Sequence, residues 1–476
     1  MRTADRPPRI GLEPSAEQLR EILTAATGYV AAHLDRLPKA PTSEAADTAA
    51  LADEAVRRPP PAEGRPFDEL LEVLDRAATP GLNTAGPGFL AFVPGSRLVS
   101  AAVADLLAGV LNRYTAFAFA APGLVALEAD VLDWLTGLFG LPPRSRGLVT
   151  SGASMATLSA VVTARSAMLP EDLRTGTLYV TEQAHHSVAK AATLAGLPAA
   201  AVRVVPVDAG LRLDPEALRS AVAEDRAAGR VLFLVSATAG TTNTGVVDPL
   251  PAIADVARDE RLWLHVDAAY GGFFQLTDRG RRRLRGIERA DSLALDAHKG
   301  LFLPFGTGIL LVRDGERLRR AHTVGEPAVY LQDIQDSDLP DFAAHGPELT
   351  RPFRGLRLWL ALHLHGVDAF RAALDAGLDL AVHAHDRLSA DRRFDVLTEP
   401  ELSTVAFRLR RGDTAELLRR VNDERRVFLS GTTVHGRYTA RVCVLNHRTD
   451  RTHVDDAIDA LRRHAAELGT AAPRLR

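Results

Sequence analysis

The sequence predicts an α/β protein with a mostly parallel sheet, preceded by a helical arm and followed by a smaller α+β domain. Between about residues 86 and 355, helical patterns alternate with short strands rich in β-branched residues. Such alternation is typical of a parallel sheet with helices on both faces. With 476 residues, the chain is long enough to bury a large core and to form more than one domain.

Residues 1–85 are expected to form an arm rather than an independent domain. Apolar residues recur at helical spacing from Ala16 to Leu37, and Pro38 ends that pattern. A segment rich in proline, alanine and charge follows, and the stretch 67–74 is amphipathic again. So few helices cannot bury their own apolar faces, so we expect them to pack on a partner subunit.

The large domain is expected at residues 86–365 and the small α+β domain at 366–476. Short apolar runs predict the strands of the large domain, at 147–150, 177–180, 202–207, 231–235, 262–266, 292–295 and 308–312. In the small domain, helical patterns mix with predicted strands at 405–409 and 441–445.

Composition argues against several classes of protein. The net charge of −3 gives no reason to expect nucleic acid or an anionic membrane as a partner. The single cysteine, Cys443, rules out a disulfide within the chain and makes a Cys/His metal site unexpected. The first residues lack the apolar stretch of a secretion signal, and no apolar run is long enough to span a membrane. We therefore expect a cytoplasmic protein without a metal.

Two predicted strand ends carry an acid and a lysine. Asp267 ends the apolar run that starts at residue 262, and Lys299 lies in Asp-Ala-His-Lys-Gly, directly after the run 292–295. Ligand sites of α/β sheets collect at such strand ends. The pair fits a pyridinium partner and a Schiff-base nucleophile, although a Lys–Asp salt bridge fits the spacing equally well.

Three other strand ends carry small or polar residues. Ser-Gly-Ala-Ser at 151–154 opens a helix and suits a phosphate, or is a simple helix cap. The segment 181–187 also opens a helix, where His185 could stack on an aromatic ring, while His186 fits a surface histidine better. The Gly/Thr-rich run 236–245 suits a ring or phosphate, or forms a plain loop.

The order of these motifs carries more information than any one of them. Gly-Ala-Ser, Gln-Ala-His, Gly-Thr-Thr, His-Val-Asp-Ala-Ala-Tyr and His-Lys follow one another between residues 152 and 299. In this order the chain resembles the group II pyridoxal-phosphate-dependent amino acid decarboxylases, the family of the aromatic-L-amino-acid, tyrosine and glutamate decarboxylases. Further matches lie at 87–94, 127–135 and 353–359, so the likeness runs from about Pro87 to Arg354.

The resemblance implies a fold, a cofactor and a set of roles. The fold is the type I, aspartate aminotransferase-like one, in a homodimer with shared active sites, and the cofactor is pyridoxal 5'-phosphate. Lys299 would form the Schiff base and Asp267 would pair with the pyridine nitrogen. Further cofactor contacts would come from His185 on the ring, Ala153 and Ser154 at the phosphate with His298 nearby, and Thr242 and Ala269 beside the ring.

The implied reaction is that of a carboxy-lyase in amino acid metabolism. An L-amino acid replaces Lys299 on the cofactor, loses carbon dioxide to leave a quinonoid, and is released as the amine. Phe89, Phe92 and Val93 would line an apolar substrate pocket without an arginine beside them. An apolar or aromatic amino acid is therefore expected rather than glutamate, with a branched aliphatic substrate still open.

One position departs from the family pattern. Counting back from Arg354 places Phe342 where aromatic amino acid decarboxylases carry a loop tyrosine that protonates the product carbon, and a phenyl ring has no proton to give. Oxidative decarboxylation-deamination to an aldehyde is thus an alternative. A phenylalanine that only packs, with His345 or Tyr330 in the catalytic role, is another. A cofactor-binding protein without turnover is a third, opposed by the retained Lys299, Asp267 and His185.

Overall fold

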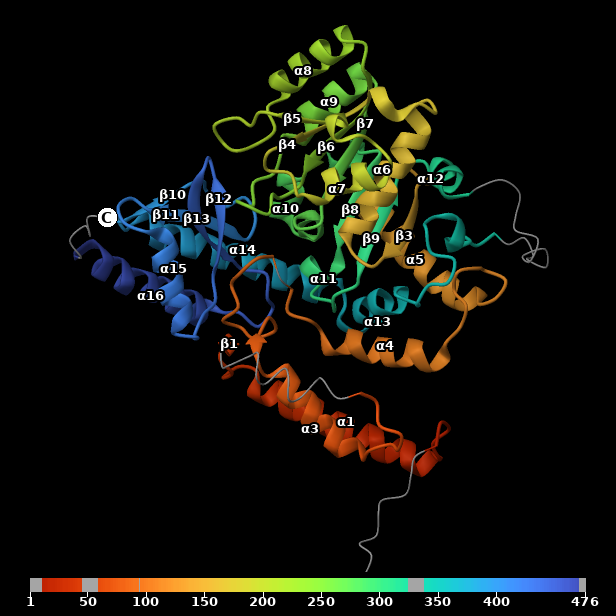
Figure 1. Cartoon of the computed structure of the whole chain (residues 1–476), viewed down its shortest axis with the longest axis vertical. Coiled ribbons are helices and arrows are strands. Elements are labelled where there is room, and N and C mark those ends of the chain that lie inside the picture. The colour runs from red at the N-terminus through yellow and green to blue at the C-terminus, as the bar shows by residue number, and fades with distance from the viewer. Residues whose placement is uncertain (1–10, 45–58, 94, 324–337, 471–476) are drawn as a thin grey trace, which may run out of the picture.

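The computed structural model describes residues 11–44, 59–93, 95–323 and 338–470 (Figure 1). Tyr330, one candidate for the loop role, lies outside these ranges. Within them, no helix combines the length and the apolar character needed to cross a membrane.

Within the described residues, the central sheet has seven strands in the order β3-β9-β8-β7-β6-β4-β5. The strands are β3 (Arg146–Thr150), β4 (Gly176–Thr181), β5 (Val202–Val205), β6 (Val231–Thr238), β7 (Trp263–Asp267), β8 (Ser292–Asp296) and β9 (Gly308–Val312). Parallel pairs join β5 through β8, whereas β9 is antiparallel to both of its neighbours. The sheet is therefore mostly parallel, as the sequence predicts, with one strand reversed.

Helices cover both faces of this sheet because alternate strand residues point to opposite sides. On β8, Leu293 and Leu295 join the core beneath one set of helices, while Ala294 joins the core beneath the other set. The first set comprises α5 (Pro122–Leu138), α8 (Pro215–Ala227) and α9 (Leu250–Glu260), and the second comprises α6 (Ala153–Met168) and α7 (Ser187–Leu194), with α12 (Gly315–His322) packed on α6. The short helices α10 (Asp278–Arg283) and α11 (Ala297–Gly300) follow β7 and β8.

A second sheet forms the C-terminal part of the molecule. Its described strands are antiparallel in the order β10-β11-β13-β12: β10 (Phe394–Val396), β11 (Thr404–Leu409), β12 (Ser430–Val434) and β13 (Arg437–Cys443). The helices α14 (Val367–Ser389), α15 (Thr414–Asp423) and α16 (Arg451–Thr470) pack with it around a separate core, and α13 (Gly355–His365) leads into α14. The predicted strands 405–409 and 441–445 lie largely within β11 and β13.

The N-terminal helices extend from the body of the molecule (Figure 1). The helices α1 (Ala16–Arg36) and α3 (Phe67–Ala78) contact each other, and the strands β1 (Ser43–Glu44) and β2 (Gly81–Leu82) form a small antiparallel pair. Neither helix has a buried residue. Large apolar side chains are exposed on both, namely Leu19, Leu23, Val30, Leu70 and Leu74.

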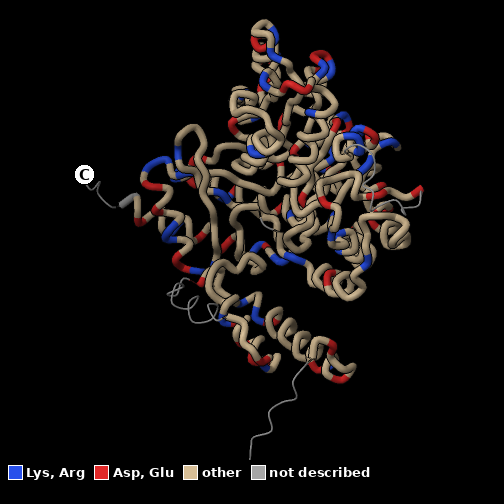
Figure 2. The backbone as a smooth tube through the Cα atoms, turned by 45° about the vertical axis from the view of Figure 1, so that its right-hand side comes forward, with Lys and Arg blue, Asp and Glu red and all other residues tan. Residues whose placement is uncertain are grey.

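A further exposed apolar face lies on α4 (Val99–Leu111), which runs along the side of the body nearest the arm in Figure 1. Its exposed residues are Val103, Leu106, Leu107, Val110 and Leu111. Charged residues, in contrast, are interspersed by sign along the described chain (Figure 2). The arm and α4 therefore both expose several large apolar side chains.

Candidate functional site

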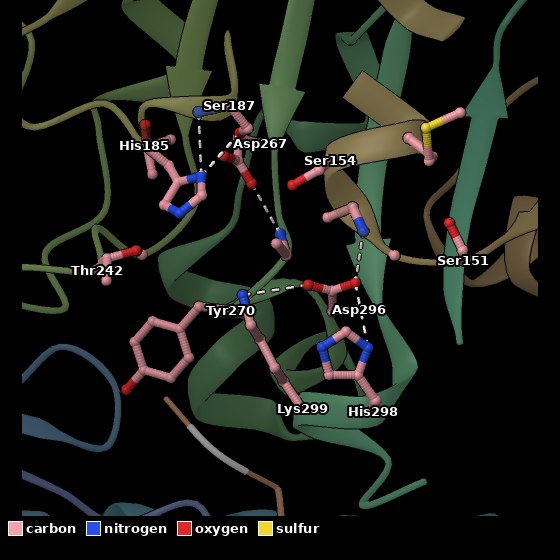
Figure 3. Close-up of a pocket in the computed structure, with 16 residues that line it drawn as sticks. Ser151, Ser154, His185, Ser187, Thr242, Asp267, Tyr270, Asp296, His298 and Lys299 are labelled. Carbon is pink, nitrogen blue, oxygen red and sulfur yellow. Dashed lines mark hydrogen bonds and ion pairs between the residues drawn. The ribbon is translucent and has the colours of Figure 1, made fainter. Parts of the chain in front are cut away.

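One pocket gathers the predicted motifs at the carboxyl ends of the central strands (Figure 3). Its volume is about 310 Å³. The lining residues are the last residues of β6, β7 and β8 together with residues from the segments that follow β3, β4, β6, β7 and β8: Ser151, Gly152, Ala153, Ser154, Met155, His185, Ser187, Thr238, Gly240, Thr242, Asp267, Ala269, Tyr270, Asp296, His298 and Lys299. All predicted cofactor contacts therefore line a single cavity.

The loop between β3 and α6 reaches the pocket because β9 lies close beneath it. A Cβ added to Gly308, the first residue of β9, would lie 2.3 Å from the carbonyl carbon of Gly152. Only a glycine permits that approach. At the start of α6, the Ala153 N–H donates to Asp296 Oδ1 at 2.6 Å. A carboxylate thus already occupies one amide of this helix N-terminus, a position that favours negative charge.

Lys299 lies on α11 beside that carboxylate. Its Nζ is 3.2 Å from Asp296 Oδ2, and its side chain keeps a fifth of its surface exposed. His298 Nδ1 is 3.5 Å from Asp296 Oδ1, and burial lowers the pKa of His298. Asp296 therefore joins the lysine, the histidine and the start of α6.

Asp267 and His185 lie at the ends of β7 and β4. Asp267 is 7% exposed, and its Oδ1 accepts a hydrogen bond from the Ala269 N–H at 3.1 Å. His185 Nδ1 lies 2.8 Å from Ser187 Oγ. Burial lowers the pKa of His185, and the negative charge of Asp267 opposes that shift. A buried acid and a largely uncharged imidazole therefore share the cavity.

Two residues that line the pocket, Tyr270 and Thr242, are hydrogen-bonded to residues of the C-terminal part of the chain. The Tyr270 hydroxyl lies 3.0 Å from Ser403 Oγ and 2.9 Å from Thr404 Oγ1, and accepts from the Ser403 N–H at 2.9 Å. Burial raises the pKa of Tyr270. Arg441 on β13 donates to the carbonyl oxygen of Thr242. The second sheet thus fixes two of the segments that line the cavity.

Sequence reasoning missed several lining residues, including Asp296, Ser187 and Tyr270. Asp296 and Tyr270 stand within the recognised motifs, Asp-Ala-His-Lys and His-Val-Asp-Ala-Ala-Tyr, and Ser187 follows the His-His pair. Their positions in the motifs could therefore be read from the sequence, but the residues that they contact in the fold could not. Ser403, for example, lies far along the chain from Tyr270.

Phe342 does not line this pocket as the single chain forms it, so its loop role stays a prediction. It is 1% exposed within the short 3-10 helix Phe342–Ala344, and the Arg351 guanidinium lies 4.9 Å from its ring centroid. The Asp341 carboxylate accepts from the Ala118 N–H at 2.8 Å, which pins the segment to the body of the protein. The Phe342 ring packs into the core of this chain, which is what the packing alternative predicts.

His345 is also buried, and desolvation lowers its pKa to about 4. It does not line the pocket of Lys299.

The predicted substrate residues Phe89, Phe92 and Val93 do not line the pocket as this chain forms it. Phe89 is buried and stacks on Phe428 with a centroid distance of 5.7 Å, whereas Phe92 is half exposed. Their role remains a prediction. Their segment nevertheless passes close to the lysine loop, because a Cβ on Gly95 would lie 1.9 Å from the His298 carbonyl oxygen.

An arginine is linked to this segment through Ser430. Ser430 Oγ accepts from the Phe92 N–H at 2.8 Å and from Arg441 Nη2 at 3.0 Å. Strand β13 brings Arg441 there from a distant part of the sequence. The absence of a nearby arginine in sequence is therefore no argument about the substrate.

The donor set fits an organic cofactor with a phosphate and an aldehyde. The pocket combines a lysine amine, a buried carboxylate, an imidazole and a helix N-terminus. The Ser154 side chain points into the cavity (Figure 3), and no hydrogen-bond partner is recorded for its hydroxyl within the described ranges. In the same ranges, no group of three or more His, Cys, Asp or Glu residues is arranged to hold a metal ion.

Comparison with known proteins gives a consistent result. The family model for the pyridoxal-dependent decarboxylase conserved domain matches residues 51–410. An aromatic-L-amino-acid decarboxylase from Bacillus atrophaeus is 33% identical over 97% of this chain and 98% of that protein. A phenylacetaldehyde synthase from Petunia hybrida is 29% identical over 86% of each. The crystal structure of Oryza sativa TDC with PLP and tryptamine has a TM-score of 0.90 and 29% identity, covering 96% of this chain and 99% of that chain.

Proposed function

Because this chain belongs to the pyridoxal-dependent decarboxylase family, we propose that it converts an L-amino acid with an aromatic side chain into the corresponding amine and carbon dioxide. The protein is a pyridoxal-phosphate-dependent carboxy-lyase with the type I fold. The observation that carries the proposal is the convergence of Lys299, Asp267 and His185 with the N-terminus of α6 in one cavity.

The residues that would hold the cofactor follow from that convergence. The amides and hydroxyls of 151–154 would receive its phosphate, with His298 close by, and Lys299 would bind its aldehyde carbon. Thr242 and Ala269 would border the ring, on which His185 would stack. When bound, pyridoxal phosphate supplies a ring that accepts the electron pair released as the carboxylate departs.

Asp267 would hold a proton at the pyridine nitrogen. Its carboxylate is buried, so an ionic hydrogen bond to that nitrogen is stronger than in water. The Ala269 N–H fixes one of its oxygens and leaves the other for this contact. Asp267 therefore keeps the ring positively charged and orients it by the same interaction.

Asp296 positions Lys299 and the phosphate loop together. One of its oxygens accepts from Ala153, and the other lies 3.2 Å from Lys299 Nζ. A phosphate at the α6 N-terminus would compete with Asp296 for the Ala153 amide. Binding of the cofactor would then leave Asp296 free to hold the lysine amine or His298.

An aromatic substrate and an amine product are supported by different observations. Relatives at 29–33% identity include aromatic and tryptophan decarboxylases. The aldehyde alternative rested on Phe342, which is buried and does not line the pocket of the single chain. The likeness to a phenylacetaldehyde synthase keeps the aldehyde as an outcome that the test must distinguish.

The deciding experiment is aerobic incubation of the cofactor-loaded protein with a panel of L-amino acids. Amine, aldehyde, carbon dioxide and peroxide are assayed together. Amine and carbon dioxide in equal amounts without peroxide are expected, with aromatic substrates preferred. Aldehyde with peroxide would favour the oxidative alternative, and cofactor binding without any product would favour a protein without turnover.

We further propose a homodimer in which the arm, residues 1–85, packs on the partner subunit. The exposed apolar side chains of α1, α3 and α4 support this arrangement, because monomeric proteins rarely expose large apolar patches. The division into a large domain at 86–365 and a small domain at 366–476 agrees with the positions of the two sheets. A cytoplasmic location fits a chain whose single cysteine is a buried free thiol.

A further inference from the structure

His185 is held by a residue two positions further along the chain. The Ser187 N–H lies 3.3 Å from His185 Nδ1 and donates to it, and Ser187 Oγ lies 2.8 Å from the same nitrogen (Figure 3). Ser187 is the first residue of α7 and is 5% exposed. The His185 imidazole is therefore hydrogen-bonded to the first residue of α7.

The backbone amide decides which nitrogen of His185 carries the proton. A hydroxyl can donate or accept, so the Ser187 side chain alone would fit either tautomer. A backbone N–H can only donate, so Nδ1 must be the acceptor. The Ser187 hydroxyl then donates to Nδ1 as well. An uncharged ring in this position carries its proton on Nε2.

The surroundings keep this ring uncharged at neutral pH. The titratable groups that act on it are Asp267, His186, Lys299 and Asp296. Burial is the largest influence and lowers the pKa of His185, the two carboxylates raise it, and the lysine and the second histidine lower it again. Protonation of Nδ1 would also break the contact to the Ser187 N–H and would force the Ser187 hydroxyl to turn from donor to acceptor, which adds to the preference for the neutral ring.

We propose that Ser187 is a positioning residue that locks His185 in the Nε2–H tautomer, so that His185 offers one uncharged hydrogen-bond donor to a carboxylate bound in the pocket. Within the described residues, no hydrogen bond to His185 Nε2 is recorded, and His185 lines the cavity. The proposal rests on the proposed function for the identity of that carboxylate, which is the one lost as carbon dioxide.

The absence of charge on this donor matters for the reaction. Carbon dioxide leaves as a neutral molecule, so negative charge moves away from the carboxylate in the transition state. An imidazolium at that place would stabilise the starting carboxylate more than the transition state and would slow the step. A neutral N–H orients the carboxylate with less of this penalty.

The tautomer is measured by long-range ¹H–¹⁵N correlation spectra of the full chain, labelled on histidine, with and without pyridoxal phosphate. A His185→Gln variant identifies the signals of His185 among the 15 histidines. We expect Nδ1 to have the shift of an unprotonated nitrogen and Nε2 that of a protonated one. The reverse pattern would overturn the proposal.

Variants at Ser187 test whether this residue holds the tautomer. The measurement is the titration of the His185 nitrogen signals between about pH 5 and pH 8, the range in which imidazoles titrate. Ser187→Ala removes one of the two donors to Nδ1, so the proton affinity of His185 should rise about five-fold, as expected for one hydrogen bond. Ser187→Thr, which keeps the hydroxyl, should restore the original titration. Ser159→Ala, a buried serine on α6 outside the pocket, is the matched control and should change nothing. An unchanged titration in Ser187→Ala would exclude Ser187 as the lock.

Two probes that are not decarboxylated test the donor itself. Indole-3-propionate has a carboxylate and no amino group, and tryptamine has the reverse. We expect the first to shift the Nε2–H signal and the second to leave it in place. Bound indole-3-propionate without a shift would contradict the donor role. Because no turnover is needed, an expected tautomer in a protein that releases no carbon dioxide would count against the proposed function alone.

Discussion

At the residue scale, the two carboxylates of the pocket hold different partners. Asp267 accepts from Ala269 at the end of β7, and Asp296 joins Lys299 to the start of α6. The separation lets one acid serve the ring nitrogen while the other serves the lysine and the phosphate loop. Substitutions of Lys299 and of Asp267 should therefore have distinct effects on cofactor attachment and on turnover.

Replacing Lys299 should abolish covalent attachment of the cofactor. The chain has only three lysines, Lys39, Lys190 and Lys299, so borohydride reduction followed by mass spectrometry locates the attachment unambiguously. We expect the adduct on Lys299 alone, and its loss in Lys299→Ala together with a fall in kcat of about a thousand-fold or more. Lys190→Ala, at an exposed position, is the control. An adduct that persists in Lys299→Ala would refute the assignment.

Asp267→Asn should leave the shape of the site intact but weaken the interaction that would hold a proton on the ring nitrogen of the cofactor. A neutral amide replaces an ionic hydrogen bond worth about twice a neutral one. We expect kcat to fall by roughly a hundred-fold or more and the cofactor to bind less tightly, because general electrostatic stabilisation of this kind is worth several kcal/mol in a buried site. Steady-state kinetics and cofactor titration measure the two effects. A variant with wild-type kcat would remove Asp267 from the mechanism.

Much of the site at this scale could be predicted from sequence, because each motif lies directly after a strand. Lys299, Asp267, His185 and Ser154 all line one cavity. Phe342 could not be placed, since an ungapped count says nothing about whether a side chain turns inward. Arg441 was invisible for a different reason, because only the pairing of β13 with β12 brings it to Ser430.

At the scale of elements, the strand patterns predicted the sheet but not the direction of β9. Apolar runs identify buried strands, and helices between them imply parallel pairs. The link from β8 to β9 contains only the short helix α11 and a loop, and β9 runs antiparallel to β8. The reversal lets Gly308 pass beneath the 151–154 loop, so this exception also shapes the site.

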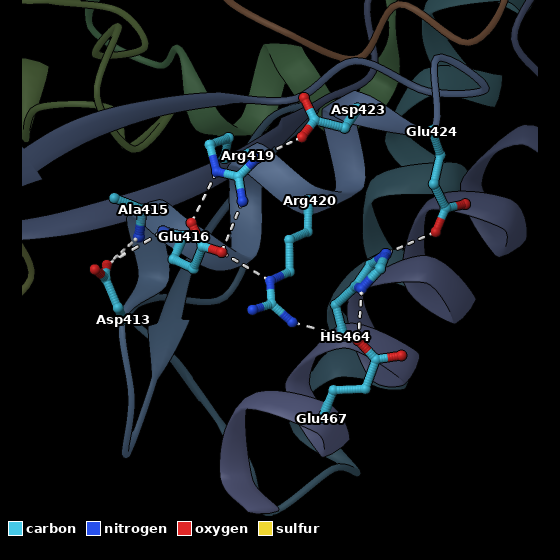
Figure 4. Close-up of polar contacts among 9 residues, drawn as sticks. All are labelled: Asp413, Ala415, Glu416, Arg419, Arg420, Asp423, Glu424, His464 and Glu467. Atoms are coloured by element: carbon cyan, nitrogen blue, oxygen red, sulfur yellow. Dashed lines mark hydrogen bonds and ion pairs between the residues drawn. The ribbon is translucent and has the colours of Figure 1, made fainter. Parts of the chain in front are cut away.

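The helix α15 offers a test of local stability away from the site (Figure 4). Asp413 is its N-cap and accepts from the Ala415 and Glu416 amides at 2.8 and 3.2 Å. Asp413→Ala should lower the free energy of unfolding by about 1 kcal/mol, whereas Asp413→Asn should be nearly neutral because asparagine caps equally well. Chemical denaturation measures both, and kcat should not change. Equal losses in the two variants would show that the charge, rather than the cap, is what stabilises the helix.

The contact between α15 and α16 combines several charged side chains. His464 Nε2 lies 2.7 Å from Glu424 Oε1, and Arg420 lies within 3.4 Å of Glu467 (Figure 4). The neighbouring His464 and Arg463 lower the pKa of Glu424, although burial opposes that shift. These pairs are partly exposed, so the apolar core beneath them is the larger source of stability.

At the scale of the whole molecule, buried histidines make stability depend on pH. Desolvation lowers the pKa of His265, His345 and His447 to about 4. The folded pKa lies below the unfolded value near 6.5, so the neutral histidines favour folding above about pH 6.5, and this contribution is lost as the pH falls toward 4. Asp248 opposes the trend, because burial raises its pKa to about 6.

We therefore expect the free energy of unfolding to decrease between about pH 6.5 and pH 4. For His265, which is fully buried, the loss is up to about 3 kcal/mol. Denaturant unfolding at fixed protein concentration, compared between wild type and His265→Gln, isolates this contribution. The stability gap between the two proteins should narrow on acidification. A constant gap would show that His265 is not the titrating group.

The assembly of two chains is the largest-scale prediction. Val110 on α4 is 77% exposed in the single chain, so Val110→Asp should cost little if the protein is a monomer. In a dimer that covers α4, the same change buries an unpaired charge and should dissociate the subunits. Sedimentation or light scattering should then report a mass near 51.1 kDa for the variant and twice that for wild type.

The control for this experiment is Val204→Asp, at a similarly exposed valine on the edge strand β5, far from α4. It should retain the wild-type mass and activity. If the active sites are shared between subunits, the Val110→Asp monomer should also lose turnover while keeping its fold by circular dichroism. A fully active monomer would separate dimer formation from catalysis and would leave the exposed face of α4 without a catalytic role.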